Sequence, residues 1–190
     1  MKIPLDDYAW GVAVANDLIA TSPTVRAGTD ALPDPAALSD FLAAHLLLRD
    51  APPSDADVHH VHLLRREVRG IVETETAEQA VAGATVLLRR AGLPPTLVRA
   101  NESRWQWLVP TAQGASLADE VAALVAVGIL GAVRTLGSER LRPCEAPDCR
   151  GVFVDISRSG RRRYCMPDLC GNRVNVSNHR ARKREGITIR

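Results

Sequence analysis

The chain has 190 residues, of which 46% are hydrophobic and 24% are charged, which is the balance of an ordinary globular protein with a sizeable core. No apolar run reaches the roughly 18 residues that a membrane helix requires; the longest candidate is 121–132. Residues 1–7 carry two acids and no basic lead into an apolar stretch, which argues against a secretory signal peptide. We therefore expect a cytoplasmic protein with reduced thiols and no membrane partner.

The net charge of +2 conceals two chemically different parts. Residues 1–138 carry 11 basic and 16 acidic side chains, a net charge of −5, whereas residues 139–190 carry 13 and 6, a net charge of +7. All four cysteines also lie in the basic final part. The sequence therefore predicts two domains, 1–138 and 139–190.

Helical periodicity dominates the first half of the chain. Apolar residues recur at helical spacing over 5–20, and a second helix is expected to begin at Pro35 after an Asp34 cap. A third helix is expected to begin after Ser54 and to continue to about residue 79. The side chains expected to face inward from the second helix are Leu38, Leu42, His45 and Leu46.

The pattern changes after a shorter apolar stretch at 82–91. Two β-prone runs, 96–100 and 105–109, flank four polar residues and predict a β-hairpin. Trp105 and Trp107 point to one side of their strand, where they either pack in the core or hairpin or form the wall of an apolar ligand pocket. A central helix is expected over 116–136, because its apolar residues cover more than one face. The predicted fold class is mainly α (α+β).

The cysteines form two close pairs, each with four residues between its members. Fifteen residues separate the pairs, a spacing that suits one tetrahedral zinc ion bound by Cys144, Cys149, Cys165 and Cys170. Four protein ligands close the coordination sphere, so the zinc is expected to be structural. Four unrelated buried cysteines and a disulfide are the alternatives. Zinc also explains how a segment with so little core can fold.

The residues around the cysteines predict a treble-clef plan. Residues 152–154 and 162–164 are expected to pair as a small hairpin, and Cys170 is expected to open a helix over 171–185. Knuckle, hairpin and helix would then surround one zinc ion.

The predicted terminal helix and the hairpin before it are rich in arginine and asparagine. Arginine matches phosphate oxygens or guanine edges, and asparagine can pair with adenine, so these residues are candidates for DNA contacts in a major groove. The candidates are Arg161, Arg162, Asn172, Arg173, Asn175, His179, Arg180, Arg182 and Lys183. Three alternatives stay open: a solvated basic helix, a module that binds an acidic partner such as residues 1–138, and a bracing role at the zinc for Asn172 and Arg173.

Other candidate chemistry is weak. His59, His60 and His62 point in different directions on a helix and are not expected to share a metal. The sequence has no glycine-rich phosphate loop, no Gly-x-Ser-x-Gly elbow and no cysteine left for nucleophilic work. We therefore do not expect an enzyme.

The final part resembles the CGNR zinc-finger family. Residues 170–173 read Cys-Gly-Asn-Arg, 153–158 resemble the family's Phe-x-Asp-x-Ser-Arg stretch, and 162–165 resemble its Arg-Arg-aromatic-Cys. Arg180 and Arg182 resemble its Arg-x-Arg ending, so that the match covers 141–184. The family often has lysine where this sequence has Asn175.

The first part resembles the ABATE domain that normally precedes this finger. Residues 12–18 are similar to a segment built around an apolar run and Asn-Thr, although Asp17 stands here in place of the threonine, and 64–69 are similar to a Leu-Arg-Glu helix. The resemblance implies a bacterial, stress-linked transcription regulator. Its first domain would sense a small-molecule ligand, and its zinc finger would bind DNA.

Overall fold

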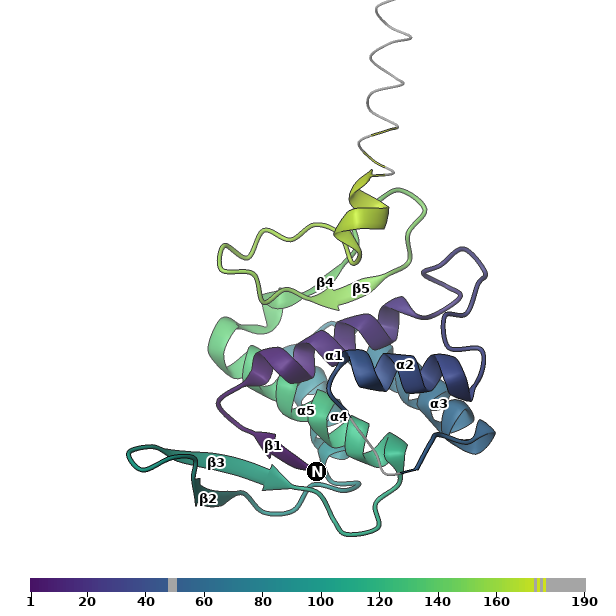
Figure 1. Ribbon diagram of the computed structural model, residues 1–190. Coiled ribbons are helices and arrows are strands. Elements are labelled where there is room, and N and C mark those ends of the chain that lie inside the picture. Colours follow the sequence, from purple (N-terminus) through teal and green to yellow (C-terminus); the bar gives the residue numbers. More distant parts are fainter. Residues whose placement is uncertain (48–50, 173, 175, 177–190) are drawn as a thin grey trace, which may run out of the picture.

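The computed structural model describes residues 1–47, 51–172, 174 and 176. A body of helices carries a small sheet at one end and the cysteine-containing segment at the other (Figure 1). This arrangement confirms the mainly helical fold class. The elements of the body are β1 (Lys2–Pro4), α1 (Tyr8–Ala20), α2 (Pro35–Ala44), α3 (Asp55–Val72), α4 (Ala77–Leu88), β2 (Thr96–Arg99), β3 (Trp105–Pro110) and α5 (Leu117–Leu136).

Helix α5 is the centre of the body, as the sequence predicts. It is buried on most of its faces and packs against α1, α3 and α4. Its alanines and glycines let α1 approach closely, since a Cβ on Gly128 would lie 2.5 Å from the backbone of Gly11. Glycine at this crossing allows the two backbones to touch. Among the described residues, no helix combines the length and the apolar character needed to cross a bilayer.

The body's sheet has the antiparallel strand order β1–β3–β2. Ile3 and Val109 face each other across β1 and β3 and are both buried. Trp105 and Trp107 are 58% and 47% exposed, so neither lies in the core. The guanidinium of Arg99 lies 5.6 Å from the ring centroid of Trp105, which is packing within the hairpin.

The first helices begin where their caps allow. Helix α1 begins at Tyr8 rather than at residue 5, because the Asp7 side chain accepts from the amide of Trp10 at 3.3 Å. Residues 2–4 form β1, which is too short to show a period, and residues 5–7 connect it to the helix. The predicted Asp34 cap of α2 is confirmed. Leu46 is 80% exposed and has a φ of 59°, so the prediction that it faces inward is wrong.

The predicted helix from Ser54 to residue 79 is in fact two helices. Ser54 caps α3 as expected, but α3 ends at Val72. The hydroxyl of Thr76 accepts from the amide of Gln79 and starts α4 in a new direction. The apolar periodicity stops at Val72, and the polar stretch 73–76 ends in the Thr76 cap, so a second helix begins there.

The cysteine-containing segment, called the finger below, begins with a 3₁₀ turn at Ser138–Arg140 and continues into β4 (Leu141–Pro143). Strand β4 pairs antiparallel with β5 (Val152–Val154), so the predicted pairing of 152–154 with 162–164 is wrong. Residues 162–164 lie beside the first cysteine turn instead, where the amide of Glu145 donates to the carbonyl of Arg163 at 2.9 Å. A short helical turn, η2 (Pro167–Gly171), closes the finger. Most of the helix predicted over 171–185 lies outside the described residues.

The finger sits on the outer side of α1 (Figure 1). Asn16 of α1 is buried, and its side-chain amide binds the backbone of β5 in both directions. Its Nδ2 donates to the carbonyl of Val154 at 3.0 Å, and its Oδ1 accepts from the amide of Val154 at 2.8 Å. One asparagine side chain thus takes the place of a neighbouring strand and fixes the finger to the body.

Replacement of Asn16 by leucine is expected to destabilise this junction by about 2–4 kcal/mol, because a buried N–H and a buried C=O then lose their partners. Thermal unfolding of the zinc-loaded variant should show a lowered midpoint or a separate transition of the finger. An unchanged midpoint would mean that the junction does not depend on this amide.

Candidate metal centre

The four cysteine sulfurs lie together. All four Sγ atoms are within 4.8 Å of one another. The Sγ of Cys149 is 3.6 Å from that of Cys165 and 3.7 Å from that of Cys170, and Cys165 and Cys170 are 3.8 Å apart. A tetrahedral zinc with bonds of about 2.3 Å places its sulfur ligands about 3.8 Å apart. The cluster therefore has the size of a four-thiolate zinc site.

The cysteines lie in two turns of the finger. Cys144 and Cys149 flank the turn between β4 and β5, Cys165 lies just before η2, and Cys170 lies in η2. Three backbone amides bind sulfur: Gly151 donates to Cys149 at 3.3 Å, Cys165 donates to Cys144 at 3.4 Å, and Ala146 also donates to Cys144. Such N–H groups favour the thiolate, the form that binds a metal.

Without a cation, Cys165 and Cys170 resist ionisation. Burial, followed by the charges of the neighbouring cysteines, raises the pKa of Cys165 far above its ordinary value. Burial and the hydrogen bond with Cys149 raise the pKa of Cys170 to about 11. For Cys144, burial is outweighed by backbone hydrogen bonds from Ala146 and Cys165, which lower its pKa. Thiolates packed this closely need a divalent cation to balance their charge, and the donor set fits one structural zinc.

Gly151 leaves room for the sulfurs. A Cβ at this position would lie 2.4 Å from the Sγ of Cys165 and 3.3 Å from that of Cys149. Replacement of Gly151 by alanine is therefore expected to weaken zinc binding, with a steric cost of about 1–3 kcal/mol. Competition with a chromophoric chelator measures the effect. Gly70→Ala is the control, because its Cβ lies in open space and should leave the zinc affinity unchanged. Gly114, which also has open space around it, is not used because its φ is positive.

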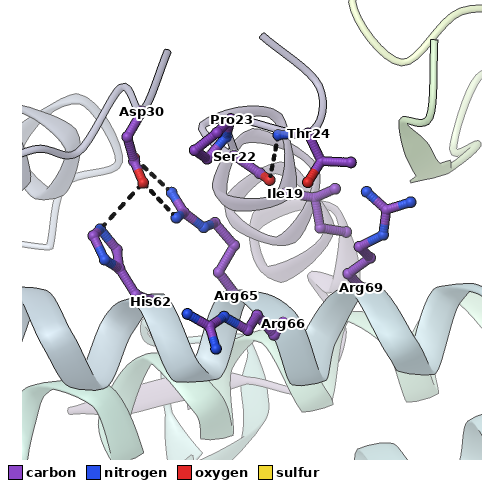
Figure 2. Close-up of a pocket in the computed structure, with 9 residues that line it drawn as sticks. All are labelled: Ile19, Ser22, Pro23, Thr24, Asp30, His62, Arg65, Arg66 and Arg69. Carbon is purple, nitrogen blue, oxygen red and sulfur yellow. Dashed lines mark hydrogen bonds and ion pairs between the residues drawn. The ribbon is translucent and has the colours of Figure 1, made fainter. Parts of the chain in front are cut away.

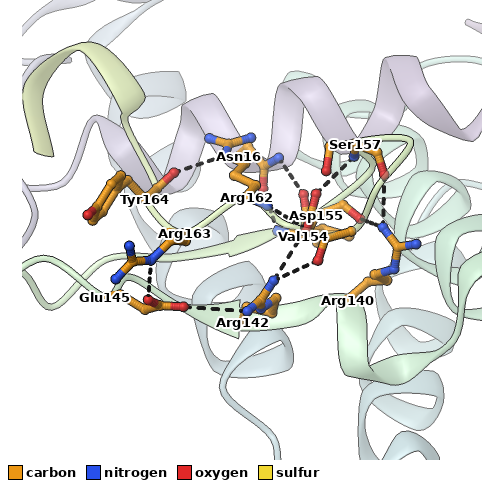
Figure 3. A network of polar contacts seen from close by, with 11 residues as sticks. Asn16, Arg140, Arg142, Glu145, Val154, Asp155, Ser157, Arg162, Arg163 and Tyr164 are labelled. Atoms are coloured by element: carbon orange, nitrogen blue, oxygen red, sulfur yellow. Dashed lines mark hydrogen bonds and ion pairs between the residues drawn. The ribbon is translucent and has the colours of Figure 1, made fainter. Parts of the chain in front are cut away.

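A buried carboxylate organises the rest of the finger (Figure 3). Asp155 is fully buried, and it accepts from the amides of Ser157 at 2.9 Å and Arg162 at 3.0 Å. It also pairs with Arg142 at 3.4 Å. Burial alone would raise the pKa of Asp155, but the hydrogen bonds from Ser157 and Arg162 and the charge of Arg140 hold it below its ordinary value. The carboxylate therefore stays ionised inside the finger and ties its loop to β4.

Arg162, one of the predicted DNA contacts, is used inside the finger. Its Nε donates to the carbonyl of Tyr164 at 2.9 Å, and its Nη2 donates to the carbonyl of Cys165. The guanidinium also lies 4.7 Å from the ring centroid of Phe153. Through these contacts Arg162 supports the backbone of the segment that carries Cys165, the third zinc ligand.

The other predicted DNA contacts differ in what the structure describes of them. Arg161 is exposed and has no side-chain partner among the described residues. Asn172 is also exposed, and its Nδ2 donates to the carbonyl of Asp168 one turn earlier, which fits the bracing alternative. The remaining candidates lie outside the described residues: Arg173, Asn175, His179, Arg180, Arg182 and Lys183.

Two residues important to the site were not among the sequence-based candidates. Asp155 follows the apolar run 152–154 and is the aspartate of the Phe-x-Asp-x-Ser-Arg stretch, which is the signal that could have identified it. Asn16 lies in an apolar helix. A buried polar residue on such a helix requires a hydrogen-bonding partner, which is the signal that could have identified it.

Comparison with protein-family models gives two matches, in the order expected. Residues 13–136 match the ABATE family, described as "Putative stress-induced transcription regulator". Residues 140–183 match the CGNR zinc finger. A search of curated proteins gave no match to this chain.

Proposed function

Since this chain belongs to the ABATE family and carries a CGNR zinc finger, we propose that it is a transcription regulator whose zinc-loaded finger binds DNA. Zinc would supply the cross-link that holds the two cysteine-bearing turns together. The helical body would hold the finger in a fixed orientation through Asn16 and β5. In this proposal the protein regulates transcription and catalyses no reaction.

The observation that carries the proposal is that some arginines of the finger form ion pairs within it, whereas others are exposed and unpaired among the described residues. Arg142 and Arg163 form ion pairs inside the finger, with Asp155 and Glu145 respectively. Arg158 and Arg161, on the loop after β5, are exposed and have no side-chain partner among the described residues. Exposed guanidinium groups without a carboxylate partner remain available for phosphate oxygens.

The net charge of +7 over residues 139–190 extends this basic character toward the end of the chain. A surface of this charge attracts a polyanion along its length, and its affinity depends steeply on salt. The alternative from a different class is a module that binds an acidic protein through the same face. The DNA proposal is favoured because the comparison with family models describes a transcription regulator.

The body is proposed to sense a small ligand and to transmit its presence to the finger. The junction offers two polar routes for such a signal: the Asn16 amide on Val154 and the guanidinium of Arg69, which donates to the carbonyl of Arg150 at 2.6 Å. Both join a helix of the body to backbone groups of the finger.

Selection from a random pool of duplex DNA with the zinc-loaded full chain tests the proposal. Enrichment of one sequence motif is the expected result for a regulator that reads DNA. Retention without enrichment would contradict sequence reading and leave only backbone binding. No retention at low salt would overturn DNA binding and favour the acidic-protein alternative.

Replacement of Arg161 by glutamine is expected to weaken DNA binding about equally for all sequences, because a phosphate contact carries no sequence information. The slope of log affinity against log salt should fall in magnitude by about 1. Fluorescence anisotropy with labelled duplexes measures both. Arg104→Gln, which removes an exposed arginine from the distant β2–β3 loop, is the matched control. Equal losses in the two variants would show that only net charge matters.

A further inference from the structure

A second polar site lies in the body, between α3 and the turn that follows α1 (Figure 2). It is a cavity of about 330 Å³, which is within the range of small-molecule sites. One wall is a single face of α3, carrying His62, Arg65, Arg66 and Arg69 at helical spacing. The opposite wall is the turn 22–24, and Ile19 adds apolar surface.

The charged groups of this cavity are unequally paired. Arg65 is buried and forms a two-pronged ion pair with Asp30, at 2.8 and 2.6 Å. That hydrogen bond holds the pKa of Asp30 below its ordinary value, so the carboxylate stays ionised. His62 donates from Nε2 to the carbonyl of Leu32 at 2.8 Å. Arg65, Asp30 and His62 therefore have hydrogen-bond partners within the protein, which hold this side of the cavity in place.

The other two arginines differ in their partners. Arg66 is exposed and has no side-chain partner among the described residues. Arg69 donates to Glu73 through Nε and Nη2, but its Nη1 is buried and has no hydrogen-bond partner in the described part of the chain. Asp30 and Glu73 balance the charges of Arg65 and Arg69, so Arg66 leaves the cavity with a positive charge that attracts an anion.

Arg69 also belongs to the junction with the finger. Its Nη2 donates to the carbonyl of Arg150 at 2.6 Å. The next amide, that of Gly151, donates to the zinc-binding sulfur of Cys149. A ligand that competes for the Arg69 guanidinium would therefore change a contact one residue away from the metal centre.

We propose that this cavity binds a small molecule carrying a phosphate monoester, held by Arg66 and Arg69, and that Arg69 relays its presence to the finger. Asp30 pairs with Arg65 and Glu73 pairs with Arg69. A phosphate head group would therefore meet the guanidinium of Arg66 and the Nη1 of Arg69, neither of which has a partner among the described residues. The apolar contribution of Ile19 and Pro23 suits the carbon part of such a molecule. This inference rests on the proposed sensing role of the body, and it identifies the chemical class of the ligand.

Isothermal titration calorimetry of the zinc-loaded full chain with glycerol 3-phosphate tests the binding step, with succinate as the carboxylate comparison. Arg66→Gln is the test variant, because the structure gives Arg66 no structural contact, and Arg104→Gln is the control. The dissociation constant for glycerol 3-phosphate should rise at least tenfold in Arg66→Gln and stay unchanged in Arg104→Gln. Absence of binding to the unaltered chain, or equal affinity in both variants, would overturn the site. Tighter binding of succinate would overturn the assignment to phosphate.

The relay is tested on the same samples by amide NMR. At saturation with glycerol 3-phosphate, the signal of Gly151 should shift together with those of α3. A shift confined to α3 would overturn the relay. Because neither measurement uses DNA, a chain that binds the phosphate ester but retains no duplex would overturn the proposed DNA binding and leave this site intact.

Discussion

Removal of zinc from the full chain is expected to unfold the finger and leave the helical body folded. The finger has a two-stranded sheet and few apolar side chains, of which Phe153 and Val154 are fully buried. Zinc binding in finger peptides contributes about 10–16 kcal/mol at neutral pH, which is far more than such a core supplies. Most residues of the core belong to the body and surround α5, and no body residue that the structure describes belongs to the cysteine cluster.

Hydrogen exchange with and without a chelator measures this effect. The amides of β4 and β5 should lose protection on zinc removal, and those of α3 and α5 should keep it. Cys170→Ser should reproduce the loss, whereas Ser159→Ala, an exposed change in the same finger, should not. Protection that survives in β5 without zinc would contradict a structural role for the metal.

Replacement of Asp155 by alanine is expected to destabilise the finger by about 3–5 kcal/mol, the usual cost of removing one partner of a buried ion pair. The change leaves Arg142 without its buried partner and the amides of Ser157 and Arg162 without an acceptor. Urea unfolding of the zinc-loaded variant, followed by a probe in the finger, measures the loss. Asp168→Ala, which removes an exposed carboxylate of the same finger, is the control.

The pH dependence of this effect follows from the pKa of Asp155, which is lowered in the folded state. The stabilisation from its carboxylate is present above the ordinary pKa of about 3.9 and is lost as the pH falls through the folded value. The difference between Asp155→Asn and the unaltered chain should therefore be constant from pH 6 to 8. A difference that grows steadily over that range would contradict an ionised buried carboxylate.

The parts of the fold that the sequence predicted correctly are those with strong local signals. The Asp34 and Ser54 caps, the two strands of the β2–β3 hairpin and the many-sided burial of α5 all follow from short-range patterns. The cysteine spacing likewise indicated the metal centre, because two close pairs of cysteines, each on a short turn, can supply the four thiolate ligands of one zinc ion.

What the sequence could not predict depends on contacts between distant residues. The partner of β5 is β4 and not the arginine-rich segment, since residues 162–164 are held by Asp155 and by the first cysteine turn. The sequence predicts that Arg162 contacts a phosphate. In the structure its guanidinium instead packs on the ring of Phe153 and donates to two backbone carbonyls. Asn16 and Val154 meet only because the finger folds back onto α1.

The central claim is that a zinc-ordered finger presents a basic surface to DNA. Its most direct test is the affinity of the zinc-loaded full chain for a mixed-sequence DNA duplex, measured from low to physiological salt. The claim predicts tight binding at low salt and a linear fall of log affinity with log salt, with a slope of about −0.9 for each phosphate contacted. Failure to bind at low salt, or an affinity that does not change with salt, would contradict it.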